Sequence, residues 1–253
     1  MQQPRIGIIL DWNPGKAEGF SSQPHYALRV HYFQAIYAAG GLPLGIPLLT
    51  GVAPAYLACL DGLLIPGGDF PFPDAWYKGG LGKNISPYAG STSHRAEVDA
   101  ELIESALAQD LPLLGICVGM QALAAVCGCR LSNRTEALTA TTMIHRSNGP
   151  EGAWHPVKVV PGTRLEHILG REMRWVNSAH NEAVWEIATP VLFNACAPDG
   201  VIEGIEISGR RFALGVQWHP ELLALGEGID AKPHFRLFQS LVEAAGDRLK
   251  VKG

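Results

Sequence analysis

Gly115-Ile116-Cys117-Val118-Gly119 is the stretch of this sequence that decides its fold. The apolar residues 113–116 predict a buried strand, and residues 118–126 predict a helix that begins with almost no turn in between. A G-x-C-x-G pattern between a strand and a helix is the cysteine version of the nucleophile elbow, a sharp turn that presents a reactive side chain. Cys117 is therefore the candidate nucleophile.

The geometry of such a turn explains its glycines. The reversal strains the backbone of the central residue and brings strand and helix so close that side chains at Gly115 and Gly119 would collide. The turn also places the Cys117 sulfur at the positive end of the helix, which favours the reactive thiolate. There the Val118 backbone N–H would point at a developing oxyanion. The alternative is a buried cysteine with glycines kept for packing, and the strand–helix context favours the nucleophile.

A cysteine nucleophile needs a histidine within hydrogen-bond reach and an acceptor that orients that histidine. His219 is the best candidate of the nine histidines, because it follows the apolar strand predicted at 212–218. Chemistry gathers at the carboxyl ends of strands in parallel α/β sheets. Pro220 disfavours helix at His219, so we expect extended chain with His219 and Glu221 pointing to one side. The predicted catalytic triad is Cys117, His219 and Glu221.

The rest of the first half alternates between apolar runs and helical periodicity, which predicts an α/β fold with a mostly parallel sheet and helices on both faces. The predicted strands are 6–10, 44–46, 61–66, 113–116 and 212–218, and the predicted helices are 26–39, 96–108, 118–126 and 233–245. Residues 138–160 and 174–207 are rich in β-branched and aromatic side chains and predict an added small β layer. With no repeat or linker, we expect residues 1–253 to form a single domain.

Composition narrows the class of protein. Hydrophobic residues make up 47% of the chain and charged residues 17%, which argues for a packed core and against disorder. The net charge is −4 without a Lys/Arg cluster, so we expect no nucleic-acid partner. The N-terminus lacks signal-peptide features and no apolar run is long enough to span a membrane. We therefore expect a soluble, cytoplasmic protein without membrane contacts.

The five cysteines are odd in number and show no disulfide framework. We expect Cys59, Cys127, Cys129 and Cys196 to fill the core. Cys127 and Cys129 form a C-x-C pair that no nearby histidine or cysteine completes, so we expect no metal site.

Residues 115–119 and 215–221 resemble the two signatures of the class I glutamine amidotransferase superfamily. The likeness is strongest to its free-standing gamma-glutamyl hydrolase branch, the peptidase C26-like group that includes the gamma-glutamyl-gamma-aminobutyrate hydrolases. Further stretches match this branch in its order and over nearly the whole chain: 64–69, 155–157, 161–163, 176–180 and 197–203.

This resemblance implies a flavodoxin-like sheet, a Cys-His-Glu triad and a covalent gamma-glutamyl thioester that water releases. It implies that the Gly68 backbone N–H completes the oxyanion hole beside Val118, and that no metal or organic cofactor is used. It also suggests that Asp69 and His180 line the substrate pocket, although Asp69 could be a turn residue and His180 a core histidine.

The chain departs from the family pattern at three places. Val118 stands where an arginine is common, Glu182 replaces a glutamine, and the loop 67–73 differs in spacing. None of these touches the triad, but all bear on the substrate. The aromatic residues of 70–88 either pack against the leaving amine or anchor their loop. Arg95 and Glu97 are interpreted as parts of a solvated helix face.

The first functional hypothesis is a stand-alone hydrolase of a small gamma-glutamyl amide. The second is a glutaminase subunit that delivers ammonia to a separate synthetase, and the third is a non-catalytic binding protein of the same fold. The absence of a synthetase region in this chain favours the first over the second, and the intact triad argues against the third. The leaving amine, the pathway and the oligomeric state stay open, with a homodimer among the options.

Overall fold

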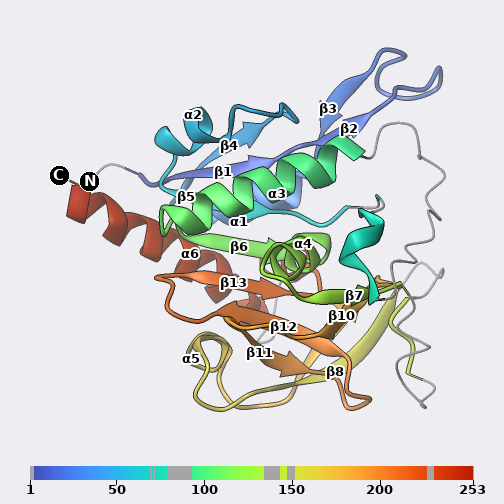
Figure 1. Cartoon of the computed structure of the whole chain (residues 1–253), viewed down its shortest axis with the longest axis vertical. Helices are drawn as coiled ribbons and strands as arrows, with labels where there is room; N and C mark the ends of the chain where they lie inside the picture. The colour runs from blue at the N-terminus through green and yellow to red at the C-terminus, as the bar shows by residue number, and fades with distance from the viewer. Residues whose placement is uncertain are drawn as a thin grey trace.

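Figure 1 shows the computed structural model of the chain, which describes residues 3–68, 70, 72–78, 93–133, 143–146, 152–226 and 231–252. Within these residues, nine strands form one sheet. In spatial order they are β4 (Leu42–Ile46), β1 (Arg5–Ile9), β5 (Gly62–Ile65), β6 (Leu113–Ile116), β13 (Ala213–Val216), β12 (Ile202–Ile207), β11 (Val191–Cys196), β8 (Ala153–Val159) and β9 (Arg174–Ser178).

The first five strands of this order are parallel to one another, and the other four continue the sheet in antiparallel fashion. Helices cover both faces (Figure 1). On one face α4 (Val118–Val126) packs beside α3 (Ser93–Ala108), which also contacts α2 (Ala53–Ala58). On the other face α1 (Val30–Ala38) packs beside α6 (Ala231–Lys252), which also contacts α5 (Arg164–Leu169).

The predicted fold class, a mostly parallel sheet between helical layers, is confirmed, and β6 and α4 have the predicted bounds. The β-rich second half takes two forms. Four of its strands extend the main sheet, whereas β10 (Ala183–Glu186) pairs with β7 (Arg130–Ser132) as a small separate sheet. One helix start is wrong: α1 begins at Val30, because residues 25–27 form a strand, β3 (His25–Ala27), that pairs with β2 (Asp11–Asn13).

The central strands are apolar on both faces because helices cover both faces. Every residue of β5, β6 and β13 is buried, as expected for parallel strands in the middle of a sheet. α4 is almost as enclosed, with residues 118–124 all buried. None of the helices in the described parts of the chain is long and apolar enough to cross a membrane.

The cysteines outside the elbow show a mixed outcome. All are free thiols, and Cys129 is buried, as expected for a core-filling residue. Cys127 and Cys196 are only partly buried, and Cys59 is exposed. The prediction of core filling is therefore wrong for Cys59, which follows the short surface helix α2.

Gly119→Ala tests the close approach of α4 to the sheet. A Cβ at position 119 would overlap the Ile65 carbonyl group of β5, which backbone geometry holds in place. We expect a loss of roughly 1–3 kcal/mol of unfolding free energy or more, measured by urea denaturation. Gly246→Ala is the matched control, because its Cβ would meet only Pro4 Cγ at 3.6 Å in the last helix. It should stabilise the protein by about 0.5–1 kcal/mol, and equal effects of the two changes would contradict this account.

Candidate active site

Cys117 lies at the turn from β6 to α4 with φ 53° and ψ −108°. A positive φ is strained for a residue with a side chain and marks functional positions. The Cys117 backbone N–H donates to Val216 O of β13 at 2.8 Å, which holds the turn against the neighbouring strand. A Cβ at Gly115 would lie 2.6 Å from Gly119 O, so the strand and helix leave no room for a side chain there. The predicted nucleophile elbow has the expected local geometry.

The Cys117 side chain lies at the N-terminus of α4, where Val118 is the first helical residue. Backbone N–H groups in this first turn have no acceptor within the helix and carry partial positive charge. The cysteine is 4% exposed, so little water screens that charge. The Cys117 sulfur therefore lies beside the positive end of the α4 dipole.

His219 and Glu221 form a buried pair after β13. His219 Nδ1 lies 2.8 Å from Glu221 Oε1, and Glu221 is 1% exposed. The predicted partners meet, but the expected reason was wrong. The chain is not extended through this segment: Pro220 begins a short 3₁₀ turn, η4 (Pro220–Leu222), and that turn brings the carboxylate back to the ring.

The imidazole of His219 also lies beside Cys117. Both contact the same glycine: a Cβ at Gly67 would lie 2.8 Å from His219 Cε1 and 3.3 Å from Cys117 Cβ. Burial lowers the pKa of His219, but the negative charge and hydrogen bond of Cys117, together with Glu221, raise it to about 10. The cluster therefore favours a protonated His219, with Glu221 fixing the ring.

Asn177 of β9 holds His219 from behind, and the sequence analysis gave it no role. Its Oδ1 accepts from the His219 backbone N–H at 2.9 Å, and its Nδ2 donates to His219 O at 3.0 Å. Gln217 supports the nucleophile, with its Nε2 3.6 Å from Cys117 Sγ. Asn177 lies within one of the motif stretches and Gln217 within another, which is the only sequence signal for either.

Arg95 is buried and does not belong to a solvated helix face. It is 2% exposed, whereas a solvated helix face was expected. Its guanidinium donates to Asp99 Oδ1 at 2.7 Å, to Asp11 Oδ1 at 2.8 Å and to Pro66 O at 3.1 Å. Arg95 thereby ties the loop after β5, which carries Gly67 and Gly68, to α3. Glu97 is exposed, as expected.

Two glycines follow β5 in this loop. The Gly67 N–H donates to the Tyr32 hydroxyl oxygen at 3.1 Å, so the Gly67 N–H already has an acceptor. Gly68 follows it and lines the same pocket as Cys117. Burial and the nearby Glu221 carboxylate raise the pKa of Tyr32, which keeps its hydroxyl neutral.

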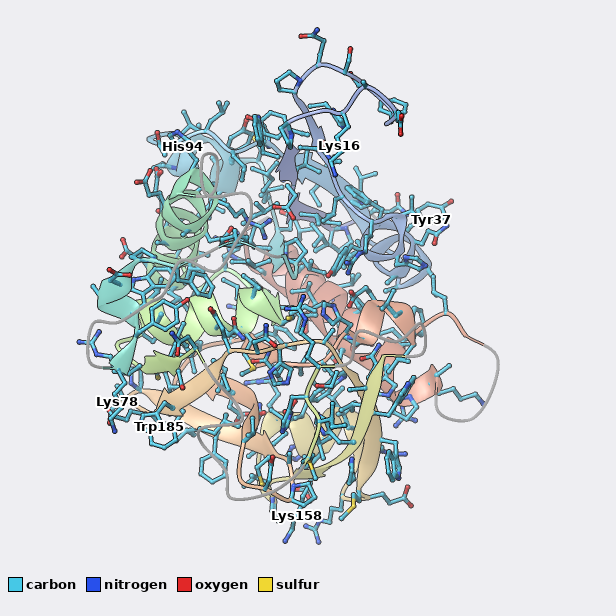
Figure 2. The ribbon with its side chains drawn as sticks, turned by 90° about the vertical axis from the view of Figure 1, so that its right-hand side faces the viewer. Lys16, Tyr37, Lys78, His94, Lys158 and Trp185 are labelled. Atoms are coloured by element: carbon cyan, nitrogen blue, oxygen red, sulfur yellow. The ribbon has the colours of Figure 1, made fainter. Side chains whose placement is uncertain are left out.

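A pocket of about 1010 Å³ opens over Cys117 and His219. Its wall carries cationic and aromatic side chains, among them Arg29, Arg146 and Phe70. Lys16, labelled in Figure 2, lies between β2 and β3, whose segment closes another side of the pocket. The space is sufficient for a small-molecule ligand with an anionic group.

Most aromatic residues of the loop after β5 that the structure describes anchor it. Phe72 is buried, and its ring centroid lies 5.5 Å from that of Phe70 and 4.9 Å from that of Trp76. Tyr77 is also buried, and its hydroxyl donates to Glu182 Oε1 at 2.9 Å. Lys78 and Trp185 lie side by side nearby (Figure 2), with the ammonium 4.9 Å from the ring centroid. Glu182 therefore supports the loop and does not line the pocket.

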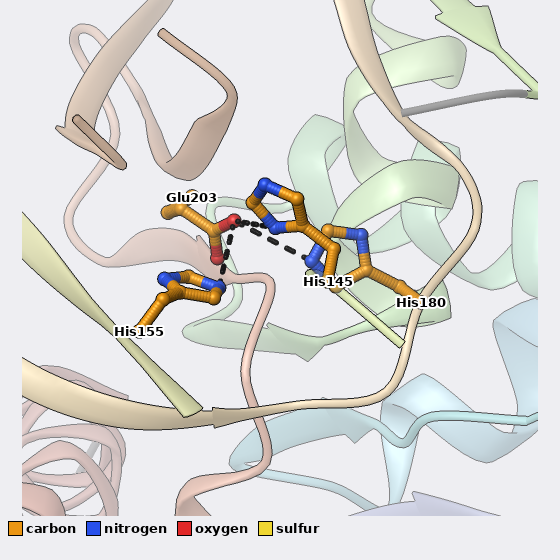
Figure 3. Close-up of side chains that lie close together, drawn as sticks. All are labelled: His145, His155, His180 and Glu203. Atoms are coloured by element: carbon orange, nitrogen blue, oxygen red, sulfur yellow. Dashed lines mark ion pairs between the residues drawn. The ribbon is translucent and has the colours of Figure 1, made fainter. Parts of the chain in front are cut away.

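The two predicted substrate contacts have different outcomes. Asp69 lies outside the described residues. His180 does not line the pocket; it is 4% exposed and belongs to a buried cluster with His145, His155 and Glu203 (Figure 3). Its predicted contact with substrate has no support from this position.

Among the described residues, the side chains of this cluster could hold a metal ion. They offer four ligand atoms that lie within 4.8 Å of one another. No metal site was expected, because nothing completes the Cys127–Cys129 pair and the family resemblance implies none. The members of this cluster lie far apart along the chain, so their spacing gives no local signal. His155, His180 and Glu203 each fall in a different motif stretch, and His145 in none. Only the pairing of β8, β9 and β12 through one sheet brings them together.

Comparison with known proteins agrees with this geometry. The sequence profile of the Peptidase C26 family matches residues 4–221. A glutamine amidotransferase-like protein of Rickettsia prowazekii is 29% identical, covering 96% of this chain and 98% of its own length. The gamma-glutamyl-gamma-aminobutyrate hydrolase of Escherichia coli O157:H7 is 31% identical over 87% of each chain.

Among solved structures, a Thermoplasma acidophilum protein described as one of the subunits of a GMP synthase has the same fold, with a TM-score of 0.65 and 16% sequence identity. The alignment covers 100% of this chain and 98% of that one. With a Cys117 elbow, a paired His219 and a matching sequence profile, this chain belongs to the Peptidase C26 family of class I glutamine amidotransferase-like proteins.

Proposed function

We propose that this protein is a cysteine hydrolase that cleaves the gamma-glutamyl amide bond of a small molecule through a thioester on Cys117. The observation that carries the proposal is that Cys117 and His219 line one pocket, while the buried Glu221 holds the far side of the His219 ring. The likeness to a gamma-glutamyl-gamma-aminobutyrate hydrolase supports the choice of bond.

In the proposed first step, the Cys117 sulfur attacks the gamma-carbonyl carbon, and the oxygen gains negative charge. The backbone N–H groups of Gly68 and Val118 donate to that oxygen. His219 then gives its proton to the leaving nitrogen, the C–N bond breaks, and the amine departs. A thioester between Cys117 and the gamma-glutamyl group remains.

In the second step, water attacks the thioester carbonyl and His219 accepts its proton. The C–S bond breaks, which releases glutamate and restores the thiolate beside the imidazolium. Glu221 stabilises the charge on the ring in both steps.

The pocket suits the head group of this substrate. A gamma-glutamyl group carries an alpha-carboxylate. Arg29 and Arg146 line the pocket, and a guanidinium group is suited to bidentate contact with a carboxylate. We propose that at least one of them binds it. Asp69 stays a predicted contact for the alpha-amino group.

Substitutions in the triad test the mechanism. Cys117→Ser should reduce kcat for the cleavage of gamma-glutamyl-gamma-aminobutyrate by at least about 10⁴-fold, and His219→Asn should be comparably severe. The loss of kcat in Glu221→Gln should be smaller than in Cys117→Ser by roughly tenfold to a hundredfold, because Glu221 orients the base without exchanging protons. Cys59→Ser is the matched control, since Cys59 is exposed and remote from the pocket. Turnover that survives in Cys117→Ser at the wild-type level would rule out the thioester.

The pH profile tests the pairing of His219. Because the His219 pKa is raised to about 10, the proton needed by the leaving amine is present at neutral pH and is lost as pH rises through that value. kcat/KM should therefore fall on the alkaline side. Glu221→Gln removes an anion that raises this pKa, so its alkaline limb should move to lower pH. The exposed Glu104→Gln is the control, and an unmoved limb in Glu221→Gln would contradict the assignment.

The choice of substrate separates a hydrolase from a glutaminase subunit. We expect the purified chain alone to release glutamate from gamma-glutamyl-gamma-aminobutyrate or another gamma-glutamyl amine. Mass spectrometry would measure the glutamate released. A glutaminase subunit should be nearly idle without its synthetase. If the chain leaves a panel of gamma-glutamyl amines intact and hydrolyses only glutamine, the proposed function is wrong.

A further inference from the structure

We propose that His145, His155, His180 and Glu203 form a structural zinc site, separate from the proposed catalytic centre. The four side chains come from the segment 143–146, from β8, from the residues after β9 and from β12. All are buried, with Glu203 at 0% exposure and none of the histidines above 5%. Figure 3 shows the three rings arranged around the carboxylate.

The distances from the Glu203 carboxylate to the three rings match the edge of a tetrahedral zinc site. Glu203 Oε1 lies 3.3 Å from His145 Nδ1, 3.5 Å from His155 Nε2 and 3.4 Å from His180 Nε2. In a tetrahedral zinc site with ligands at 2.0–2.1 Å, two ligand atoms are about 3.3–3.4 Å apart. The carboxylate oxygen is therefore separated from each nitrogen by about one edge of the zinc tetrahedron.

Hydrogen bonds behind the rings fix which nitrogen carries a proton. His180 Nδ1 lies 2.9 Å from Glu182 O, and His155 Nδ1 lies 3.2 Å from Pro156 O. A carbonyl oxygen can only accept, so these ring nitrogens are the donors. His145 Nε2 lies 2.9 Å from Asp199 Oδ2, the arrangement in which a carboxylate orients a zinc-binding histidine.

The inner nitrogen of each ring faces the Glu203 carboxylate. Among the described residues, His145 Nδ1, His155 Nε2, His180 Nε2 and both oxygens of Glu203 are buried without a hydrogen-bond partner. An unsatisfied buried polar atom is costly. A divalent cation between the three ring nitrogens and the Glu203 carboxylate would satisfy these atoms, and its charge would balance Glu203 and Asp199.

Four protein ligands and no exposed face describe a closed site, which is the structural type of zinc site and not the catalytic one. The ion would join three strands of the antiparallel half of the sheet to the segment 143–146. That segment is already held by β9 and its end, because His145 O accepts from Ser178 Oγ at 2.6 Å and from the His180 N–H at 3.1 Å. Its next residue, Arg146, lines the pocket, so zinc would fix one wall of that pocket.

Zinc content of the intact chain tests the proposal directly. The purified protein is stripped with a chelator, incubated with ZnSO₄ and dialysed. It should then retain about one zinc per chain, measured by inductively coupled plasma mass spectrometry. Crystals of this protein should show an anomalous peak at the zinc edge between the three rings. Zinc should raise the Tm of the stripped protein by about 5–15 °C.

Variants locate the ion. Glu203→Gln and His155→Gln should each reduce retained zinc by at least about tenfold, because the loss of a ligand or of its charge weakens binding. His94→Gln is the control for the loss of a histidine, since the His94 side chain is 69% exposed and remote from the cluster. Circular dichroism verifies that each variant is folded.

Three results would overturn the site: wild-type protein that retains less than about a tenth of an equivalent of zinc, equal zinc in Glu203→Gln and His94→Gln, or an anomalous peak elsewhere. The crystallographic and stoichiometric measurements on the wild type decide the matter even if both variants fail to fold. None of these readouts depends on enzymatic activity.

Discussion

The contact between α4 and the backbone of the strands beneath it is the constraint on which this structure depends. Gly119 lies against the Ile65 carbonyl group, and Gly115 against Gly119 itself. This contact leaves no length of chain for a relaxed turn, so Cys117 takes up the reversal alone, at a positive φ. The same strain that costs free energy points the sulfur out of the sheet and into the pocket.

Polar side chains then hold the loops that surround Cys117. Arg95 fixes the loop after β5 through Pro66 O, and Asn177 fixes the backbone of His219 on both sides. Both act by hydrogen bonds to main-chain atoms, which do not depend on the neighbouring side chains. Arg95 is costly to remove, because it is the partner of the buried Asp99 carboxylate, and removal of one partner of a buried ion pair typically costs about 3–5 kcal/mol.

The sequence predicted the parts of this structure that arise from local patterns. Short stretches predicted the apolar runs at β5, β6 and β13, the helix α4 and the grouping of Cys117, His219 and Glu221, since strand burial and elbow glycines leave local signals. The actual route from His219 to Glu221 could not be predicted, because a 3₁₀ turn and an extended chain place the two side chains near each other equally well. Arg95 was misjudged for a related reason, since its partners Asp11 and Pro66 are distant in the sequence.

The cluster of His145, His155, His180 and Glu203 shows most clearly what a single sequence does not predict. Each of its members has an ordinary neighbourhood in the sequence, and only the order of strands in the sheet makes them neighbours. Long-range pairing of this kind has no periodicity that a single sequence reveals. His180 was consequently assigned to a pocket that its ring does not reach.

The register between β5, β6 and β13 also has an evolutionary consequence. Leu63 pairs with Leu113, and Leu113 with Ala213, so the separation of the reacting groups is set by the spacing of neighbouring strands, about 4.8 Å. The walls of the pocket come instead from connecting segments such as the one between β2 and β3. Insertions and substitutions in those segments leave the pairing of the central strands unchanged. Related proteins can therefore acquire new substrate specificities while they keep the same reacting groups.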